Sequence, residues 1–244
     1  MKVLKTVDPQ EQREVEELIQ QQKRLHIAPS PVVYLTAEVQ TLDGEPLARY
    51  EDRSRSWVRN YYNWMATQTL ARGAEALGNT YGAGTLVMKD ISGSVQGYSE
   101  ICYHVYNSNE YTFNEGMRGA SGNTNIGIVV GTGTGPENFD AYKLTTLIPH
   151  GTATGQLQYQ EMGPGTLSWD SVGKKFVQVL ERIFINNSGG TITVGEAGIY
   201  AKIRASSAYY YSFLIARDVL SPAIEVPNSS QLKVTYTIEL ALPA

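Results

Sequence analysis

Alternating apolar and polar positions dominate the chain and predict β-strands. Apolar side chains recur at every second residue over 33–39 and again over 232–240, which is the period of a half-buried strand. Asp43 and Gly44 supply a turn that would pair the first of these strands with residues 47–53. Further strands are expected at 85–89, 100–106, 126–130, 156–160, 175–186, 191–203 and 209–217, and the last alternating segment is expected to form a strand over 231–240.

Turn signals and the order of the strands indicate how they are arranged. Residues 187–190, Asn-Ser-Gly-Gly, predict a hairpin turn between the two longest strands. In the second of these strands the apolar parity shifts at Gly195 and Glu196, which predicts a β-bulge. Because strands follow one another without alternating helices, the fold class is expected to be mainly β, an antiparallel β-sandwich of jelly-roll type. Residues 31–244 would form this single domain.

A helical arm is predicted over residues 1–30. Asp8 as N-cap, Pro9 at the first helical position and Glu11 three residues after the cap form a capping-box arrangement. A helix of this length is marginal alone in water and needs a surface to pack on. That surface could be the body of its own chain or a neighbouring subunit, and the sequence leaves both open. The apolar side chains on one helical face are Val15, Leu18, Ile19 and Leu25, with Gln22 interrupting them.

Two further segments carry the aromatic residues. Residues 56–72 predict a helix whose aromatic side chains pack on a sheet, with a ligand-stacking platform as the alternative. Residues 78–125 form an insert rich in Gly, Asn, Ser and Tyr. Tyrosine combines a large apolar ring with a polar tip, so tyrosines in this insert would suit subunit contacts or sugar stacking. They are Tyr98, Tyr103, Tyr106 and Tyr111.

Charge and cysteine content exclude several classes of protein. The chain has 20 Lys and Arg against 24 Asp and Glu in 244 residues, a net charge of −4, which excludes a strongly basic nucleic-acid clamp. A single cysteine, Cys102, excludes an internal disulfide framework. The start of the chain does not resemble a signal peptide, and no apolar run approaches the roughly 20 residues of a membrane span. We therefore expect no nucleic-acid or membrane partner and folding in the cytoplasm.

Candidate chemistry is sparse. Residues 131–135, Gly-Thr-Gly-Thr-Gly, lack the Lys and Ser or Thr of a phosphate loop and predict a flexible inter-strand loop. The three histidines are isolated, so no metal site or cofactor is expected. A hydrolase pair remains a weaker hypothesis because sequence does not measure the distance between carboxylates. No motif selects a pair from the candidate acids, which are Asp90, Glu100, Glu110, Glu115, Glu161 and Asp170.

Four blocks of the chain resemble virion structural proteins of tailed bacteriophages. They are residues 56–63 (SWVRNYYN), 127–133 (GIVVGTG) with Asp140 and Tyr142 after it, 186–200 and 214–240. The resemblance implies a non-enzymatic structural subunit, made in the host bacterial cytoplasm and located in the virion. It would decorate the capsid or build the neck or tail through contacts with copies of itself and other virion proteins.

The resemblance implies no catalytic residues and does not cover the arm or the insert. We nevertheless expect the assembly interface there, because both segments offer side chains that could become ordered on assembly. The residues expected in it are Val15, Leu18, Ile19, Leu25, Tyr98, Tyr103, Tyr106 and Tyr111. The alternative function is a receptor- or glycan-binding module of a tail or head fibre, with a host surface glycan as partner.

Overall fold

The computed structural model describes residues 1–25, 31–70, 87–96, 116–204 and 210–241. Within these residues the fold is mainly β and contains two helices, α1 (Pro9–Arg24) and α2 (Arg59–Leu70). Most strand pairs are antiparallel, and the sheets are not closed. The predicted mainly β class with antiparallel sheets is therefore confirmed, whereas a jelly-roll path is not established by the strand order.

The large sheet has the strand order β1-β3-β2-β12-β9-β7, with β8 pairing β9 beside β7. Strand β1 runs parallel to β3, and every other pair in the sheet is antiparallel. Its strands are β1 (Lys2–Lys5), β2 (Val32–Thr41), β3 (Pro46–Arg53), β7 (Gln158–Tyr159), β8 (Thr166–Asp170), β9 (Lys175–Asn186) and β12 (Ser230–Ala241).

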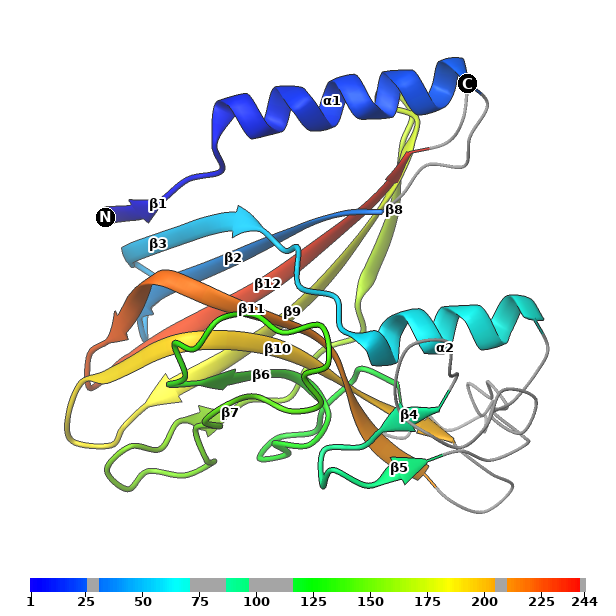
Figure 1. The fold of residues 1–244 in the computed structure, drawn as a ribbon. Helices are drawn as coiled ribbons and strands as arrows, with labels where there is room; N and C mark the ends of the chain where they lie inside the picture. Colours follow the sequence, from blue (N-terminus) through cyan, green and yellow to red (C-terminus); the bar gives the residue numbers. More distant parts are fainter. Residues whose placement is uncertain (26–30, 71–86, 97–115, 205–209, 242–244) are drawn as a thin grey trace.

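The small sheet has the order β11-β10-β6 and packs against the large sheet (Figure 1). Its strands are β6 (Gly127–Gly131), β10 (Ile192–Arg204) and β11 (Tyr210–Val226), and β4 (Met88–Lys89) with β5 (Val95–Gln96) forms a separate two-stranded ribbon. Alternation directs one apolar face of each sheet inward, and the two faces share one hydrophobic core. Its fully buried members include Leu35, Phe184 and Val234 from the large sheet and Ile128, Ile199 and Ile215 from the small sheet.

The structure corrects one predicted connection and confirms another feature. Strands β9 and β10 lie in different sheets, so residues 187–190 are a crossover between the sheets and the predicted hairpin is wrong. The bulge is confirmed, since the β10–β11 register shifts between Val194 and Glu196. Strand β11 continues to Val226, well beyond the expected end at residue 217. Strands β1 and β8 were not predicted, and residues 100–106 lie outside the described residues.

Helix α2 packs on the small sheet, as its aromatic content predicts. The Asn60 amide donates to the carbonyl oxygens of Lys89 and Leu214, which fixes the helix start against β4 and β11. The Trp57 and Tyr61 rings follow with centroids 4.1 Å apart. Among the described residues, neither helix is long and apolar enough to cross a membrane.

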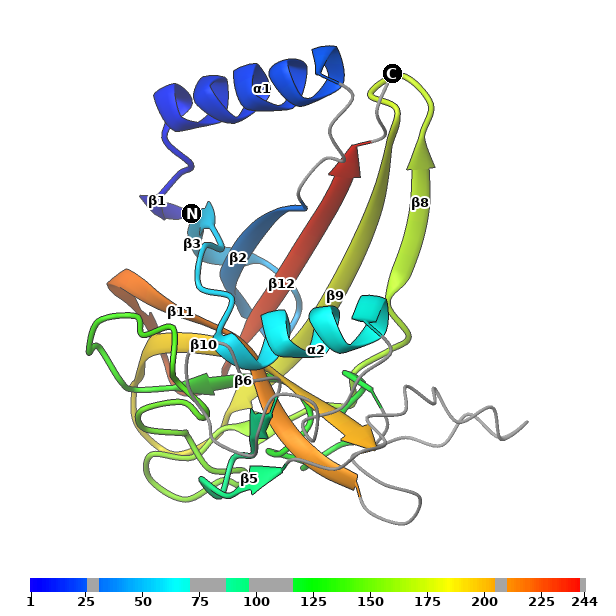
Figure 2. The same cartoon turned by 45° about the vertical axis from the view of Figure 1, so that its right-hand side comes forward.

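The large sheet extends beyond the small sheet at one end. Figures 1 and 2 show β8 and the adjoining ends of β9 and β12 projecting past β10 and β11, with α1 lying over one face of the extension. We call this part of the large sheet, consisting of β8 with residues 175–178 and 238–241, the projection. The inner face of the sheet is the one that carries the core, and the outer face is the one that α1 covers.

Candidate functional surfaces

Helix α1 is attached to its own chain near its first turn. The Asp8 carboxylate caps the helix by accepting from the backbone N–H of Gln10 at 2.8 Å. Glu11 forms ion pairs with Arg53, at 2.9 Å, and with Arg55. Val15 is buried, and the helix lies over the outer face of the large sheet of the same chain. In this structure the arm therefore packs on its own body.

The predicted apolar stripe of α1 divides between two environments. Val15 is buried and Ile19 is half-buried, and both line the space between the helix and the sheet. Leu18 and Leu25 remain 52% and 60% exposed. At 100° per residue, Ile19 lies only 40° from Val15, whereas Leu18 lies 60° away on the other side, toward solvent. The arm thus keeps two leucines that its own chain does not cover.

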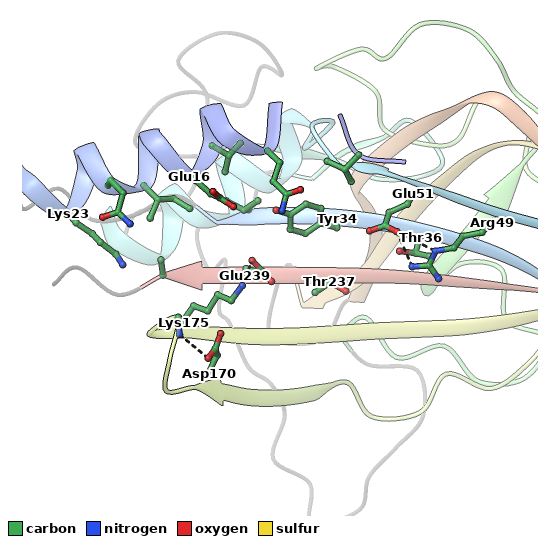
Figure 3. Close-up of a pocket in the computed structure, with 18 residues that line it drawn as sticks. Glu16, Lys23, Tyr34, Thr36, Arg49, Glu51, Asp170, Lys175, Thr237 and Glu239 are labelled. Atoms are coloured by element: carbon green, nitrogen blue, oxygen red, sulfur yellow. Dashed lines mark hydrogen bonds and ion pairs between the residues drawn. The ribbon is translucent and has the colours of Figure 1, made fainter. Parts of the chain in front are cut away.

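A groove of about 550 Å³ lies between α1 and the outer face of the large sheet (Figure 3). Its charged side chains are largely paired with one another: Lys175 meets Glu239 at 2.8 Å, and Arg49 meets Glu51 at 3.0 Å. Burial and the nearby Glu239 carboxylate raise the pKa of the lining residue Tyr34. In the described residues the first of these ion pairs joins the neighbouring strands β9 and β12, and the second joins two side chains of β3.

The inner face of the projection carries an exposed apolar surface. Trp169 lies opposite Phe176 in the β8–β9 register, and Phe176 lies opposite Leu240 in the β9–β12 register. The Trp169 and Phe176 rings have centroids 5.0 Å apart. Leu167 follows on the same face because it is two residues from Trp169. We call Leu167, Trp169, Phe176 and Leu240 the hairpin patch; their exposed fractions are 70%, 45%, 39% and 38%.

A buried ion pair holds the glycine-rich loop after β6. Glu196 and Arg217 meet at 2.6 Å, and the Arg217 guanidinium also donates to the carbonyl oxygens of Gly135 and Pro136. A Cβ at Gly133 would lie 2.4 Å from a Glu196 carboxylate oxygen, so the glycine is needed for close approach. The Glu196 carboxylate fills the space that a side chain at position 133 would need. The loop is therefore an inter-strand loop that a buried acid holds in place.

Arg182 is a second buried cation, and its role was not predicted from the sequence. Its guanidinium donates to the carbonyl oxygens of Gln160, Ala120, Ile126 and Ile128 at 2.8–3.0 Å. Burial lowers the pKa of Arg182 to about 10, so it stays protonated at neutral pH. Arg182 lies two residues from Phe184 on the apolar face of β9, and this position in the sequence pattern could have predicted a buried arginine. The residue joins the strand to the loops before β6 and after β7.

Asp218 is a buried acid between the two sheets. Its Oδ2 accepts from the Tyr236 hydroxyl and the Ser54 hydroxyl, each at 2.9 Å, while Oδ1 has no partner among the described residues. Burial raises the pKa of Asp218 to about 7, against the opposing effect of these two hydrogen bonds. Tyr236 belongs to β12 and Asp218 to β11. These hydrogen bonds therefore link the two sheets through Asp218.

The candidate acids that the structure describes have local structural roles. Asp90 accepts from Ser92, Ser94 and Gln96, and Asp170 accepts from the turn N–H groups of Val172 and Gly173. Glu161 forms an ion pair with Arg118. The His150 ring accepts a hydrogen bond from the backbone N–H of Tyr159. Within the residues described, no three His, Cys, Asp or Glu side chains lie close enough together to hold a metal ion. The remaining candidates lie outside the described residues: Tyr98, Glu100, Cys102, Tyr103, His104, Tyr106, Glu110, Tyr111 and Glu115, together with His26.

Comparison of the chain with protein-family models, with curated proteins and with solved structures finds no match. The candidate surfaces are the two exposed leucines of α1, the groove beneath that helix, and the hairpin patch. Of these, the hairpin patch is the largest group of uncovered apolar side chains that the described residues bring together.

Proposed function

We propose that the protein is a non-enzymatic structural subunit of a tailed-bacteriophage virion. It would assemble with copies of itself and with other virion proteins to decorate the capsid or build the neck or tail. In this proposal the two mainly antiparallel sheets pack around one core as a rigid β-sandwich, and the subunits contact one another through the parts that project from it. The resemblance of the four sequence blocks supplies the virion setting.

The hairpin patch is the observation that carries the assembly role. Soluble chains that act alone rarely leave several large apolar side chains exposed together, because such surfaces associate in water. Here Leu167, Trp169 and Phe176 stand on a sheet extension that no second layer of described residues covers. Aromatic side chains are also the residues most enriched at the centre of protein interfaces. The exposed Leu18 and Leu25 add a second uncovered apolar surface on α1.

Quantitative mass spectrometry of purified virions tests this function. Particles released by the cells that encode the chain are banded by density, and peptides of the chain are counted relative to the major capsid protein. We expect repeated copies per particle that stay with the band after high-salt washing. Absence of the chain from banded particles, or loss of all copies in the wash, would contradict the virion role. A stacked subunit is held by buried apolar area, which salt strengthens rather than weakens.

A further inference from the structure

Strand β8 forms an open edge of the large sheet. It pairs with β9 from Thr166 opposite Val179 to Asp170 opposite Lys175, and β7 pairs with the same edge of β9 further along. The other edge of β8 has no neighbouring strand in the part of the chain that the structure describes. Figure 2 shows β8 at the outer side of the projection, away from α1. Such an edge presents backbone N–H and C=O groups that can pair with another strand.

The two edges of the large sheet differ in how they resist pairing. Strand β1 at one edge has the sequence Lys-Val-Leu-Lys, and edge lysines oppose the approach of a second strand. Strand β8 has the sequence Thr-Leu-Ser-Trp-Asp, with neither lysine nor proline. Its Leu167 and Trp169 are exposed on the face that continues the core. The β8 edge thus carries neither lysine nor proline to oppose the approach of a second strand.

We propose that β8 pairs antiparallel with β8 of a second copy across a two-fold axis, so that the large sheet continues from one subunit into the next. A register centred on Ser168 pairs all five residues of the strand. It sets Leu167 opposite the partner's Trp169, and Thr166 opposite the partner's Asp170. Each apolar side chain then meets an apolar one, and no like charges face each other.

The composition of the edge favours a copy of this chain as the occupant. The same five residues serve both sides of a two-fold interface, and the sequence is complementary to itself in this register. The exposed parts of the Trp169, Phe176, Leu167 and Leu240 side chains amount to a few hundred Å², less than the roughly 800 Å² per partner of a standard interface. Backbone hydrogen bonds between the two edges would supply the further contact that the side chains alone do not provide.

Association of the purified full chain tests the pairing. In sedimentation velocity the smallest species of the unchanged chain is expected to be a dimer. Leu167→Lys or Trp169→Lys should raise the dissociation constant at least about tenfold, because each places a charge against an apolar partner in the pairing face. The matched control is Val172→Lys, which makes the same kind of change at a turn residue that is 93% exposed and outside β8. The control should remain a dimer.

A cysteine on the two-fold axis tests the register. In a Cys102→Ser background, Ser168→Cys should form a disulfide-linked dimer on mild oxidation, because directly opposed strand residues have Cα atoms about 4.5–5.5 Å apart. Val172→Cys is the control, since it lies in the turn beyond Asp170, and in this register the Asp170 ends of the two strands are already roughly 13 Å apart along the strand direction. Cross-linking at position 168 with weakening by both lysine variants supports the pairing.

Three results would overturn it: a monomer at all accessible concentrations, an oligomer that both lysine variants leave intact, or no cross-link at position 168. An intact oligomer would leave the proposed virion role standing while removing the β8 edge from it. A monomer that is nevertheless found in virions would assign the edge to a different protein. The inference requires only a second copy, so it does not depend on where in a particle the chain acts.

Discussion

Strands β9 and β12 each pass through two regions of the molecule, the core between the sheets and the projection beyond it. In the core, Phe184 of β9 and Tyr236 of β12 are fully buried beneath the small sheet. In the projection, Phe176 and Leu240 lie on the same inner face of the same strands, yet they are 39% and 38% exposed. Alternation along a strand thus decides which face a side chain takes. Burial depends on whether a second layer is present, which the strand's own pattern does not specify.

The two regions also treat charge differently. The core contains Arg182 and the pair Glu196 and Arg217, and each of these side chains is satisfied by several hydrogen bonds. A charge removed from water needs such partners, so these residues join the strands to specific loops. In the projection, charges such as Lys175 and Glu239 stay on the outer face as partly exposed ion pairs. Buried polar contacts therefore fix the position of loops against the core strands. The projection instead exposes apolar side chains on its inner face.

Phenylalanine truncations give the largest contrast between the regions. We expect Phe184→Ala to lower the free energy of unfolding by about 3–5 kcal/mol, since it removes a fully buried ring that packs edge-on against Tyr159. Phe176→Ala should cost less than about 1 kcal/mol, because the ring is already partly in water. Urea unfolding at two protein concentrations separates folding from association. Equal losses in the two variants would show that the projection is covered in the free chain.

Asp218 provides a pH test of the core. Its pKa of about 7 in the folded chain lies above the ordinary value of 3.8, so the folded state binds a proton that the unfolded state releases between these values. The contribution of this group to the free energy of unfolding is therefore complete below about pH 4 and falls as the pH rises to about 7. Above that pH it levels off, and the total loss is up to about 4 kcal/mol. Asp218→Asn stays neutral and should lose this slope, becoming the more stable form at pH 8. Thermal unfolding at pH 5 and pH 8 measures the difference; parallel slopes would contradict the buried-acid assignment.

The strands of the core could be predicted because their alternation is strong. Residues 175–186 were predicted and found as β9, and the last strand was found at Ser230–Ala241, within one residue of its prediction. The connection between β9 and β10 was not predictable from the turn residues. The sequence Asn-Ser-Gly-Gly suits a tight reversal in either a hairpin or a crossover. The choice is made by β12, which pairs with β9 from more than 40 residues away in sequence.

Within the projection only strand β8 was missed, because it has little independent signal in the sequence. Thr166–Asp170 is five residues long, is mostly exposed, and becomes a strand by pairing with β9. Leu167 and Trp169, two residues apart between Gly165 and Gly173, were the available sign. The predicted interface residues Val15 and Ile19 face their own sheet, whereas Leu18 and Leu25 are exposed. The four predicted tyrosines lie outside the described residues, so their role stays a prediction.

The smallest expected effect concerns how α1 is held over the projection. Glu11→Gln removes the ion pairs to Arg53 and Arg55, which are partly exposed and therefore worth only about 0.5–1 kcal/mol. Amide hydrogen exchange in α1 should quicken roughly two- to fivefold, while global stability is unchanged. Added salt should produce the same change in the unchanged chain. The control is Glu17→Gln, an exposed acid on the same helix.

Measuring hydrogen exchange in α1 at several protein concentrations tests whether the helix packs on its own chain or on another subunit. If α1 packs on its own chain, exchange in the unchanged protein and its acceleration by Glu11→Gln are independent of concentration, because no second molecule is needed. If the arm instead docks on another subunit, protection of α1 rises with concentration and follows the association curve. The ion pairs of Glu11 join the arm to its own β3 region, so concentration independence is expected. Leu18 and Leu25 would then remain available for a further contact while Val15 keeps the helix in place.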